Sequence, residues 1–432
     1  MDVASPSTFR LLRRALTIVA LFLGQGVRWL FGWLILLMAR ASLARRREWF
    51  AECVLDLFRH LGATFIKVGQ IMSTRPDLVP EHITRALAHL QDDVGPFPYE
   101  AVARTIAEDL GRPIDHVFAD FSIRPLASAS VAQVHKARLP DGRVVAVKVR
   151  RPDVAEICAF DLAVMRFVGR LLGKIPWLAG VDPSSSVEQF GRAIHAQLDF
   201  RVEAQNNRRF RHNFRNEPDI VFPEVFEAFS SERILCMTHF EGTKILDPRV
   251  RTGQPKRIAR LGLHALLKMI FEDGFVHADL HPGNLFVLDD NRLGIVDLGL
   301  VGELDLPHRA GLARFFAAWA GRDADKVARL LYSLAVAPAP GGDSFERFHA
   351  AVIDFMNRTW GQRMAEVHPG KVLLDMLGLL RRHHLRVAPA FTIVNIAIAV
   401  TEGIGRQLDP DLDVMAESIP FFAAHPDLFQ SD

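Results

Sequence analysis

The sequence has few cysteines and no excess of charge of either sign, and each shortage excludes a class of protein. Its three cysteines, Cys53, Cys158 and Cys236, are far apart and odd in number, so they form neither a disulfide framework nor a zinc-binding spacing. This usage fits a reducing compartment. The formal net charge of +2 argues against a nucleic-acid-binding protein that relies on a basic surface.

Length and composition indicate a large folded protein. A chain of 432 residues suits two or three domains, or one two-lobed domain with extensions. Apolar residues make up 49% of the sequence, which allows a large core and does not indicate disorder.

A polar motif at residues 275–284, followed by Asp297-Leu298-Gly299, gives the strongest chemical indication. Two apolar runs flank an Asp-Asp-Asn turn and predict a β-hairpin, with Asp279 before it, Asn284 at its start and Asp297 at its end. Phosphoryl transfer needs one carboxylate at the attacking hydroxyl or water. It also needs an amide oxygen and a second carboxylate that hold Mg²⁺ against the nucleotide phosphates. We therefore assign Asp279 as catalytic base or water-positioning group, and Asn284 and Asp297 as metal ligands.

Each of these residues also has a structural interpretation, since Asp caps turns and ends strands. The joint spacing favours catalysis, because it equals that of the protein-kinase catalytic loop and its Asp-Phe-Gly motif. His277 is expected to orient the loop rather than to take part in chemistry. For His281 two roles stay open, approach to the phosphates or packing.

Upstream, a loop of small residues at 124–131 leads into a second predicted hairpin. Its strands, 131–139 and 144–149, are joined by a Pro-Asp-Gly turn. A Lys in an apolar strand needs a partner or an anion, so Lys148 is predicted to bind the nucleotide phosphates. Its predicted partner is Glu203, in the helical segment 152–211, although Glu203 could also be a surface residue. Small residues free backbone N–H groups to approach phosphates, so the loop positions are candidate nucleotide contacts: Ala127, Ser128, Ala129, Ser130 and Val131.

Residues 220–225 and 233–237 are predicted as strands four and five of this first lobe. Met237 is expected to border the adenine, and Glu241-Gly242 to form the hinge to a helical second lobe. An amphipathic helix at residues 261–275 is expected to feed the catalytic loop.

Several features of protein kinases are missing. The small-residue loop at 124–131 contains no glycine, so it should be stiffer than the glycine-rich loop of protein kinases. No long activation segment separates Gly299 from the next predicted helix at 308–320, and Ala278 stands where kinases controlled by activation-loop phosphorylation have Arg. These differences argue against phosphorylation of peptides.

An apolar run at residues 15–38 is long enough to span a bilayer. Basic residues flank both ends and so orient it poorly. Gln25 and Arg28 fall on one side of the helix, and Arg is costly in mid-membrane unless it faces protein or reaches the interface. The run therefore predicts a membrane-associated helix, either an interfacial anchor or a span whose polar stripe meets a partner. A buried helix packed on the main domain is the alternative.

A predicted α-hairpin follows, with Lys67 and Gln70 one turn apart on a shared helix face. From the residues alone, this pair is typical of a solvated surface.

Together these motifs resemble the UbiB/AarF family of atypical kinase-like proteins, which is linked to coenzyme Q (ubiquinone) biosynthesis. The resemblance covers about residues 50–415. It rests on the family's Lys-x-Gly-Gln signature, its alanine-rich loop, Val147-Lys148, Glu203-Ala204, the His277 to Asn284 motif and Asp297-Leu298-Gly299.

The resemblance implies an ATP- or ADP-binding, Mg²⁺-dependent protein with ATPase or small-molecule kinase activity. It implies that Lys67, Gly69 and Gln70 restrain nucleotide chemistry. The family has Glu-x-Asp before the ion-pair Glu, whereas this chain has Gln197-Leu198-Asp199, which leaves Asp199 as the remaining regulatory carboxylate. Many bacterial members end in membrane-spanning helices, and here the N-terminal helix is expected to substitute.

The predicted fold class is α+β, a two-lobed atypical protein-kinase-like fold with a small β-rich N-lobe, a helical C-lobe and a helical N-terminal extension. The predicted division is a membrane-associated helix (1–48), a helical extension (49–115), an N-lobe (116–240), a C-lobe (241–415) and a tail (416–432).

The predicted function is an ATP- and Mg²⁺-dependent kinase or ATPase that supports quinone biosynthesis at the inner (cytoplasmic) membrane, with its catalytic domain in the cytoplasm. Expected partners are membrane lipid, quinone precursors and other quinone-biosynthesis proteins, and no nucleic acid. A nucleotide-gated scaffold or lipid-binding chaperone is the alternative, and an antibiotic- or choline-type phosphotransferase ranks last because it does not explain Lys67 to Gln70.

Overall fold

The protein is described here by a computed structural model that covers residues 8–73, 80–90, 95–173, 183–338, 345–360, 369–383, 385–387 and 389–429. The chain divides into two compact units. Unit 1 comprises Met1–Arg201 and Phe226–Cys236, and unit 2 comprises Val202–Val225 and Met237–Asp432.

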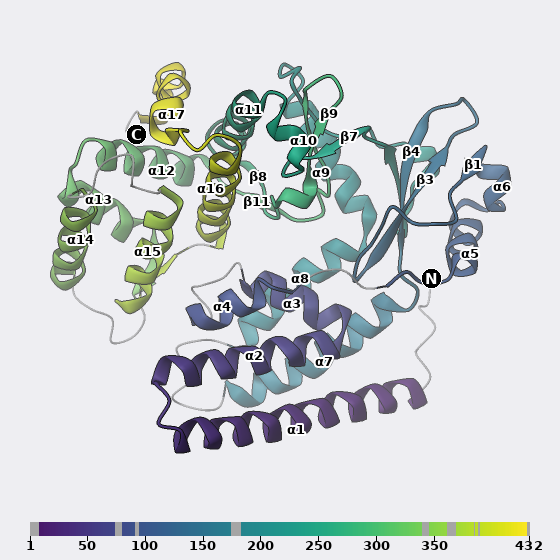
Figure 1. Ribbon diagram of the computed structural model, residues 1–432, viewed down its shortest axis with the longest axis horizontal. Helices are drawn as coiled ribbons and strands as arrows, with labels where there is room; N and C mark the ends of the chain where they lie inside the picture. Colours follow the sequence, from purple (N-terminus) through teal and green to yellow (C-terminus); the bar gives the residue numbers. More distant parts are fainter. Residues whose placement is uncertain are drawn as a thin grey trace. The chain divides into compact units, whose positions relative to one another are not determined.

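Unit 1 begins with a long helix, α1 (Thr8–Met38), that runs beside α2 (Leu43–Leu61) (Figure 1). The turn between them uses Arg40 at a φ of 52°, and Ser42 caps α2 by accepting from the N–H of Arg45. Gly62, at a φ of 85°, ends α2, because this backbone conformation favours glycine. The other helices of the unit are α3 (Ala63–Ser73), α4 (Glu81–Leu87), α5 (Tyr99–Leu110), α6 (Ile114–Val117), α7 (Val154–Leu172) and α8 (Pro183–Leu198).

The sheet of unit 1 has the order β1-β3-β4-β6, with β2 paired to β3. Its strands are β1 (Asp120–Phe121), β2 (Ala127–Ser128), β3 (Ala132–Arg138), β4 (Val144–Arg150) and β6 (Ile234–Thr238). The β3–β4 hairpin confirms the prediction, with Lys148 opposite Val134. Alternate residues of β4, Val145, Val147 and Val149, are fully buried against α5, which fixes the register of the strand.

Unit 2 contains a second sheet in the order β5-β10-β9-β7, made of β5 (Ile220–Val221), β7 (Gly242–Lys244), β9 (Leu285–Leu288) and β10 (Leu293–Ile295). The antiparallel β9–β10 pair is the predicted hairpin. The prediction for residues 220–225 was wrong in one respect. β5 pairs in parallel with β10 of unit 2 and is not a strand of the first sheet. Its neighbour Phe222 stacks on Phe210 at 5.0 Å, which holds the segment to the core of unit 2.

Helices make up most of unit 2 and share one apolar core. They are α9 (Phe200–Asn213), α10 (Pro248–Arg251), α11 (Pro255–Leu267), α12 (Leu306–Ala320), α13 (Ala324–Ser333), α14 (Phe345–Trp360), α15 (Pro369–Arg382), α16 (Pro389–Leu408) and α17 (Val414–Ala424). The short strands β12 (Ala335–Pro338) and β13 (Leu385–Val387) pair with each other. A π-helical turn, Lys268–Glu272, links α11 to the next strand, so the regular helix predicted to reach residue 275 ends earlier.

Candidate functional site

Two short strands of unit 2 bring the predicted catalytic and metal-binding motifs together. β8 (Phe275–His277) ends directly before Ala278 and Asp279, and β11 (Val301–Glu303) begins directly after the segment at 297–300. The strands are antiparallel, with His277 opposite Val301. The N–H of Ala278 also donates to Leu300 O at 3.0 Å. The pairing therefore holds the start of one motif against the end of the other.

His277 orients this loop, as predicted. Its side chain is fully buried, and its Nδ1 accepts from the N–H of Asp279 at 3.0 Å. Nε2 must then carry the proton, and it lies 3.2 Å from Val296 O, to which it donates. Burial lowers the pKa of His277, which keeps the ring neutral and preserves this pattern.

His281 and Asn284 shape the rest of the loop. The Nδ1 of the exposed His281 accepts from the N–H of Gly283 at 3.0 Å, and a Cβ on Gly283 would lie 2.6 Å from the His281 ring, so glycine is required there. Asn284 is buried, and its Nδ2 donates to Asp279 O at 3.1 Å. Since the amide nitrogen is used in this way, the Oδ1 of Asn284 is the atom that remains for a metal.

Asp297 has an unusual backbone conformation, with a φ of 61°. Few residues other than glycine adopt this left-handed region, and such strain concentrates at functional sites. The segment is fixed on both sides, since Val296 N–H donates to Asn284 O at 3.0 Å and Leu298 is fully buried in the core. These contacts hold the Asp297 backbone close to Asn284.

Helix α9 supplies a third element of this site. Glu203 is 3% exposed, and a Cβ placed on Gly299 would lie 3.4 Å from its Oε2 and 3.9 Å from Asp297 Oδ1. Asn206 lies one turn further along α9, where its Nδ2 donates to Leu298 O at 2.8 Å. Two residues on one face of α9 therefore contact the Asp297-Leu298-Gly299 segment.

The donor set in unit 2 fits a magnesium ion that is held jointly with phosphates. Asn284 and Asp297 provide an amide oxygen and a carboxylate, both hard oxygen ligands. Within the described residues, no group of three or more His, Cys, Asp or Glu side chains forms a metal cluster. Mg²⁺ in phosphoryl-transfer sites is usually bound by one or two carboxylates plus phosphate and water, so two protein ligands suffice.

In unit 1, the alanine-rich loop forms a tight turn before β3. Ala127 and Ser128 pair with β3, and the N–H of Ala129 donates to Ala132 O at 2.7 Å. Ser130 and Val131 are buried at the turn. The turn is therefore part of the sheet and is not an open loop.

Arg151 fixes this turn from the end of β4. Its Nη2 lies 3.0 Å from Ala129 O, 3.0 Å from Gly95 O and 3.3 Å from Ser128 Oγ, and its guanidinium stacks 5.1 Å from the Phe97 ring centroid. Burial lowers the pKa of Arg151. Sequence reasoning missed this residue, although a cation directly after Lys148-Val149-Arg150 was a visible signal.

The other predicted nucleotide contacts are strand residues. Lys148 is half-buried on β4, and its Nζ lies 5.4 Å from the ring centroid of Phe200. Met237 is buried on β6.

Lys67, Gly69 and Gln70 lie on α3. A Cβ on Gly69 would be 2.2 Å from Leu90 Cδ1 and 2.7 Å from Phe58 Cδ2, so only glycine allows the helices to pack this closely. The Nε2 of Gln70 donates to Leu90 O at 3.3 Å. The glycine and glutamine of the signature therefore hold α3 against the chain after α4, and Lys67 is half-buried on the same helix.

Asp199 has a local structural contact. It accepts from the N–H of Arg201 at 3.0 Å and forms an ion pair with the Arg201 guanidinium at 2.8 Å. The hydrogen bond from the Arg201 side chain lowers the pKa of Asp199. The carboxylate thereby caps the first turn of α9, the helix that carries Glu203.

Comparisons with known proteins identify the family of this chain. Residues 89–331 match the ABC1 atypical kinase-like domain, and residues 352–413 match the UbiB helical domain. The chain is 36% identical over 373 residues to the probable protein kinase UbiB of Aliivibrio fischeri, which covers 84% of this chain and 68% of that protein. It is 34% identical over 400 residues to the probable protein kinase UbiB of Vibrio cholerae, with coverage of 89% and 73%.

Among solved structures, the fold is similar to that of Rv3197 from Mycobacterium tuberculosis, determined as a complex with erythromycin. The TM-score is 0.58, the sequence identity is 26%, and the match covers 84% of this chain and 92% of that one. This similarity confirms the kinase-like α+β fold predicted from the sequence.

Proposed function

Because the chain belongs to the UbiB family of ABC1 atypical kinase-like proteins, we propose that it is an ATP-binding, Mg²⁺-dependent kinase or ATPase that supports ubiquinone biosynthesis at the membrane. One observation carries the proposal. The β8–β11 pair and α9 gather Asp279, Asn284, Asp297 and Glu203 around one loop in unit 2. This is the set of groups that phosphoryl transfer needs.

Each residue has a proposed role. Asp279 positions the attacking hydroxyl or water, and Asn284 and Asp297 hold the metal. When bound, Mg²⁺ would neutralise charge on the phosphates. His277 holds the backbone of Asp279 in place through its neutral ring.

Further candidate residues have proposed contacts with the nucleotide. Lys148 is proposed to bind phosphate oxygens, the turn at Ala127 to Val131 to approach the phosphates, and Met237 to border the base. Lys67, Gly69, Gln70 and Asp199 are proposed to restrain turnover, since they fix α3 and the start of α9.

The acceptor is proposed to be water or a small molecule rather than a peptide. Between Gly299 and the start of α12 at Leu306, the chain forms only β11 and short links. There is consequently no room in the sequence for the long segment on which protein kinases bind a peptide substrate.

Nucleotide turnover and nucleotide binding test the proposal separately. We expect full-length protein in mild detergent to hydrolyse ATP with Mg²⁺, more rapidly with anionic vesicles and a quinone-precursor-like phenol. The Asp279→Asn variant should lose turnover and still bind nucleotide. Asp297→Asn should lose the thermal stabilisation by Mg²⁺ and nucleotide, and Asn is a fair probe because it tolerates a left-handed φ.

Two results would change the proposal. An unchanged thermal shift in Asp297→Asn would remove that residue from the metal site. Nucleotide binding without turnover above the Asp279→Asn level would favour a nucleotide-gated scaffold for quinone precursors.

A further inference from the structure

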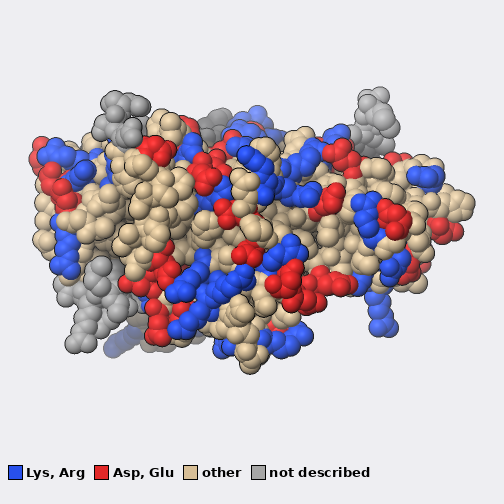
Figure 2. All heavy atoms as spheres, turned by 90° about the horizontal axis from the view of Figure 1, so that it is seen from above, with Lys and Arg blue, Asp and Glu red and all other residues tan. Residues whose placement is uncertain are grey.

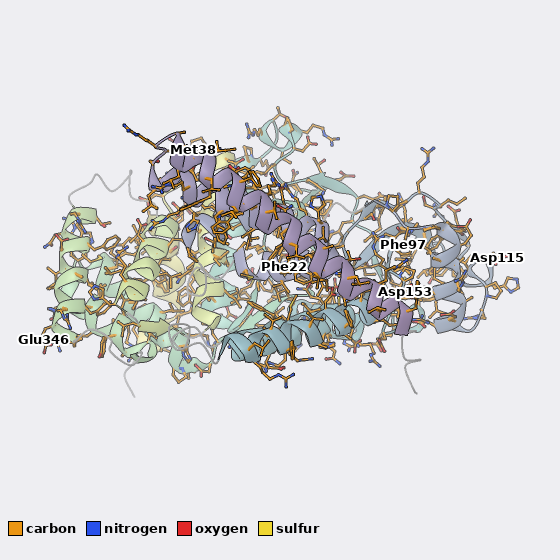
Figure 3. All side chains as sticks on the ribbon, turned by 90° about the horizontal axis from the view of Figure 1, so that it is seen from below. Phe22, Met38, Phe97, Asp115, Asp153 and Glu346 are labelled. Carbon is orange, nitrogen blue, oxygen red and sulfur yellow. The ribbon has the colours of Figure 1, made fainter. Side chains whose placement is uncertain are left out.

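Helix α1 is oriented in the opposite way to a surface helix of a water-soluble protein. Such a helix packs its apolar stripe on the core and turns its charges to solvent. In α1, the polar residues Arg14, Gln25 and Arg28 lie on the side that meets α2 and α7 of the same unit. The opposite side is apolar, and Figure 3 looks onto it, with Phe22 and Met38 labelled.

The inner side of α1 is held by specific contacts along its length. Near its start, Arg14 Nε donates to Asp161 Oδ1 at 2.9 Å, and its Nη2 donates to Asp161 Oδ2 at 2.7 Å and to Leu61 O at 2.6 Å. Ile18 is buried in a small apolar cluster with Leu57 and Leu61.

The same side is held further along the helix. Arg28 pairs with Asp56 at 2.5 Å, and its guanidinium lies 5.2 Å from the Trp49 ring centroid. Gly32 allows Trp49 to approach, since a Cβ there would lie 2.2 Å from the indole nitrogen.

The outer side of α1 exposes large apolar side chains from end to end. Leu16, Leu23, Phe31 and Ile35 are each more than half exposed. Helix α7, joined to α1 through the contact of Asp161 with Arg14, adds the exposed side chain of Phe167. A contiguous apolar surface of this extent is rare on monomeric soluble proteins and marks an interaction site. The surface in Figure 2 differs from this apolar side of α1, because Lys and Arg side chains are interspersed there with Asp and Glu side chains.

We propose that this apolar face of α1, extended by α7, lies in the interface of a lipid bilayer with the axis of α1 along the membrane plane. Charge favours a bilayer as the occupant. Arg13 in α1, Arg40 directly after it and Arg47 in α2 are exposed basic residues, and α1 contains no acidic residue. Basic residues attract anionic headgroups, whereas two copies of α1 packed on each other would bring basic residues together without acidic partners.

The inner contacts favour a flat position over a span. By length and composition, Leu12–Met38 could cross a membrane. Within the most apolar 18-residue stretch of this segment, 6% is buried in the structure. A span would place Gln25 and Arg28 near the middle of the bilayer and would separate Arg14 and Arg28 from their carboxylates. Charged residues in the hydrocarbon core are costly unless paired. A flat position keeps both ion pairs and immerses only the apolar side.

This inference rests on the membrane location in the proposed function and specifies its geometry. The test is flotation of full-length protein with vesicles of phosphatidylcholine, alone or with phosphatidylglycerol. Leu23→Glu should weaken vesicle binding at least about tenfold, because a side chain immersed in lipid becomes charged. The matched control is Ile123→Glu, which alters an equally exposed apolar residue outside α1, α2 and α7 and should bind as the wild type does.

A labelling experiment separates the two orientations. Phe9→Cys and Met38→Cys place a thiol near either end of α1, where both side chains are largely exposed. The native cysteines are buried, so the wild type gives the background. With protein bound to sealed vesicles from outside, a membrane-impermeant maleimide should label both ends. Labelling of one end alone would show a span and overturn the flat position.

Two further outcomes complete the test. Equal flotation of Leu23→Glu and wild type would overturn the assignment of this face. The alternative occupant is a second copy of the chain. It would be shown if the wild type does not bind vesicles and forms a dimer, and if Leu23→Glu converts that dimer to a monomer. Asp297→Asn should float as the wild type does, so a failure of the catalytic proposal is distinguished from a failure of this one.

Discussion

The ion pair between Arg14 and Asp161 leads to an asymmetric prediction. Asp161 is fully buried, whereas the Arg14 side chain is 21% exposed. Replacing Arg14 with Leu leaves a carboxylate without its partner in the interior, which costs about 3–5 kcal/mol. Replacing Asp161 with Leu leaves an Arg that keeps its bond to Leu61 O and reaches water, so the expected loss is only about 1–2 kcal/mol.

The double variant Arg14→Leu/Asp161→Leu should recover most of this loss. Removing both members of a buried pair in favour of apolar groups is often neutral or stabilising. For a unit of this size, each 1 kcal/mol shifts the melting temperature by about 2–4 °C. Arg14→Leu should therefore melt roughly 6–20 °C below the wild type, and the double variant within about 4 °C of it.

The assay is thermal unfolding in mild detergent, with hydrogen exchange of α1 and α7 to show where the loss occurs. A double variant as unstable as Arg14→Leu alone would refute the reasoning, because the loss would then come from packing and not from the unpaired charge. Equal losses in the two single variants would refute the assigned difference in burial.

Three other perturbations follow from the structure. Gly69→Ala should destabilise unit 1 by about 1–2 kcal/mol in thermal melts, since the clash with Leu90 outweighs a helix-propensity gain of about 1 kcal/mol. Arg151→Lys should weaken nucleotide binding in titrations, about tenfold, because an ammonium group cannot reproduce the three contacts of the guanidinium. Burial lowers the pKa of His277 in the folded state, so below about pH 6.5 the unfolded chain binds a proton that the folded chain does not. The free energy of unfolding should therefore fall as the pH drops below this value, by at most about 1.4 kcal/mol per pH unit from His277.

Each has a matched control. Gly262 is also helical, but a Cβ added there would meet nothing within 4 Å, so Gly262→Ala should stabilise, and a loss equal to that of Gly69→Ala would contradict the clash. Arg143→Ala, at an exposed turn, should leave nucleotide affinity unchanged, and a loss as large as in Arg151→Lys would argue against a specific role for Arg151. His277→Gln should flatten the acid limb of the stability curve, and an unaltered slope would assign it to other groups.

The sequence predicted the elements that local pattern determines. The hairpins at Val134–Lys148 and at β9–β10 follow from alternating apolar residues around turn residues. The orienting role of His277 also followed from its place in a dense motif. Asn206 was missed, although it lies one turn from Glu203 on α9, because an Asn in a helix has no distinctive pattern.

Features that depend on distant partners were not predictable from local pattern. The strand at Ile220–Val221 has the right composition for either sheet, and it pairs with β10 next to Phe222, which stacks on the distant Phe210. The π-helical turn at Lys268–Glu272, whose residues Lys268 to Phe271 are buried, likewise has no distinctive local pattern. The sequence placed Arg28 on a polar side of α1 but could not show that its partner would be Asp56 of the next helix.

The pairing of β8 with β11 has a consequence for the way this site opens. The residues that precede Asp279 and those that follow Asp297 exchange hydrogen bonds with each other, so neither segment can leave its position alone. The amide hydrogens of Val276, Ala278 and Gly302 should therefore exchange with solvent at one common rate, as a single cooperative unit. Local melting of the β8–β11 pair would therefore displace Asp279 and Asp297 together in one step, while the helical core stays folded.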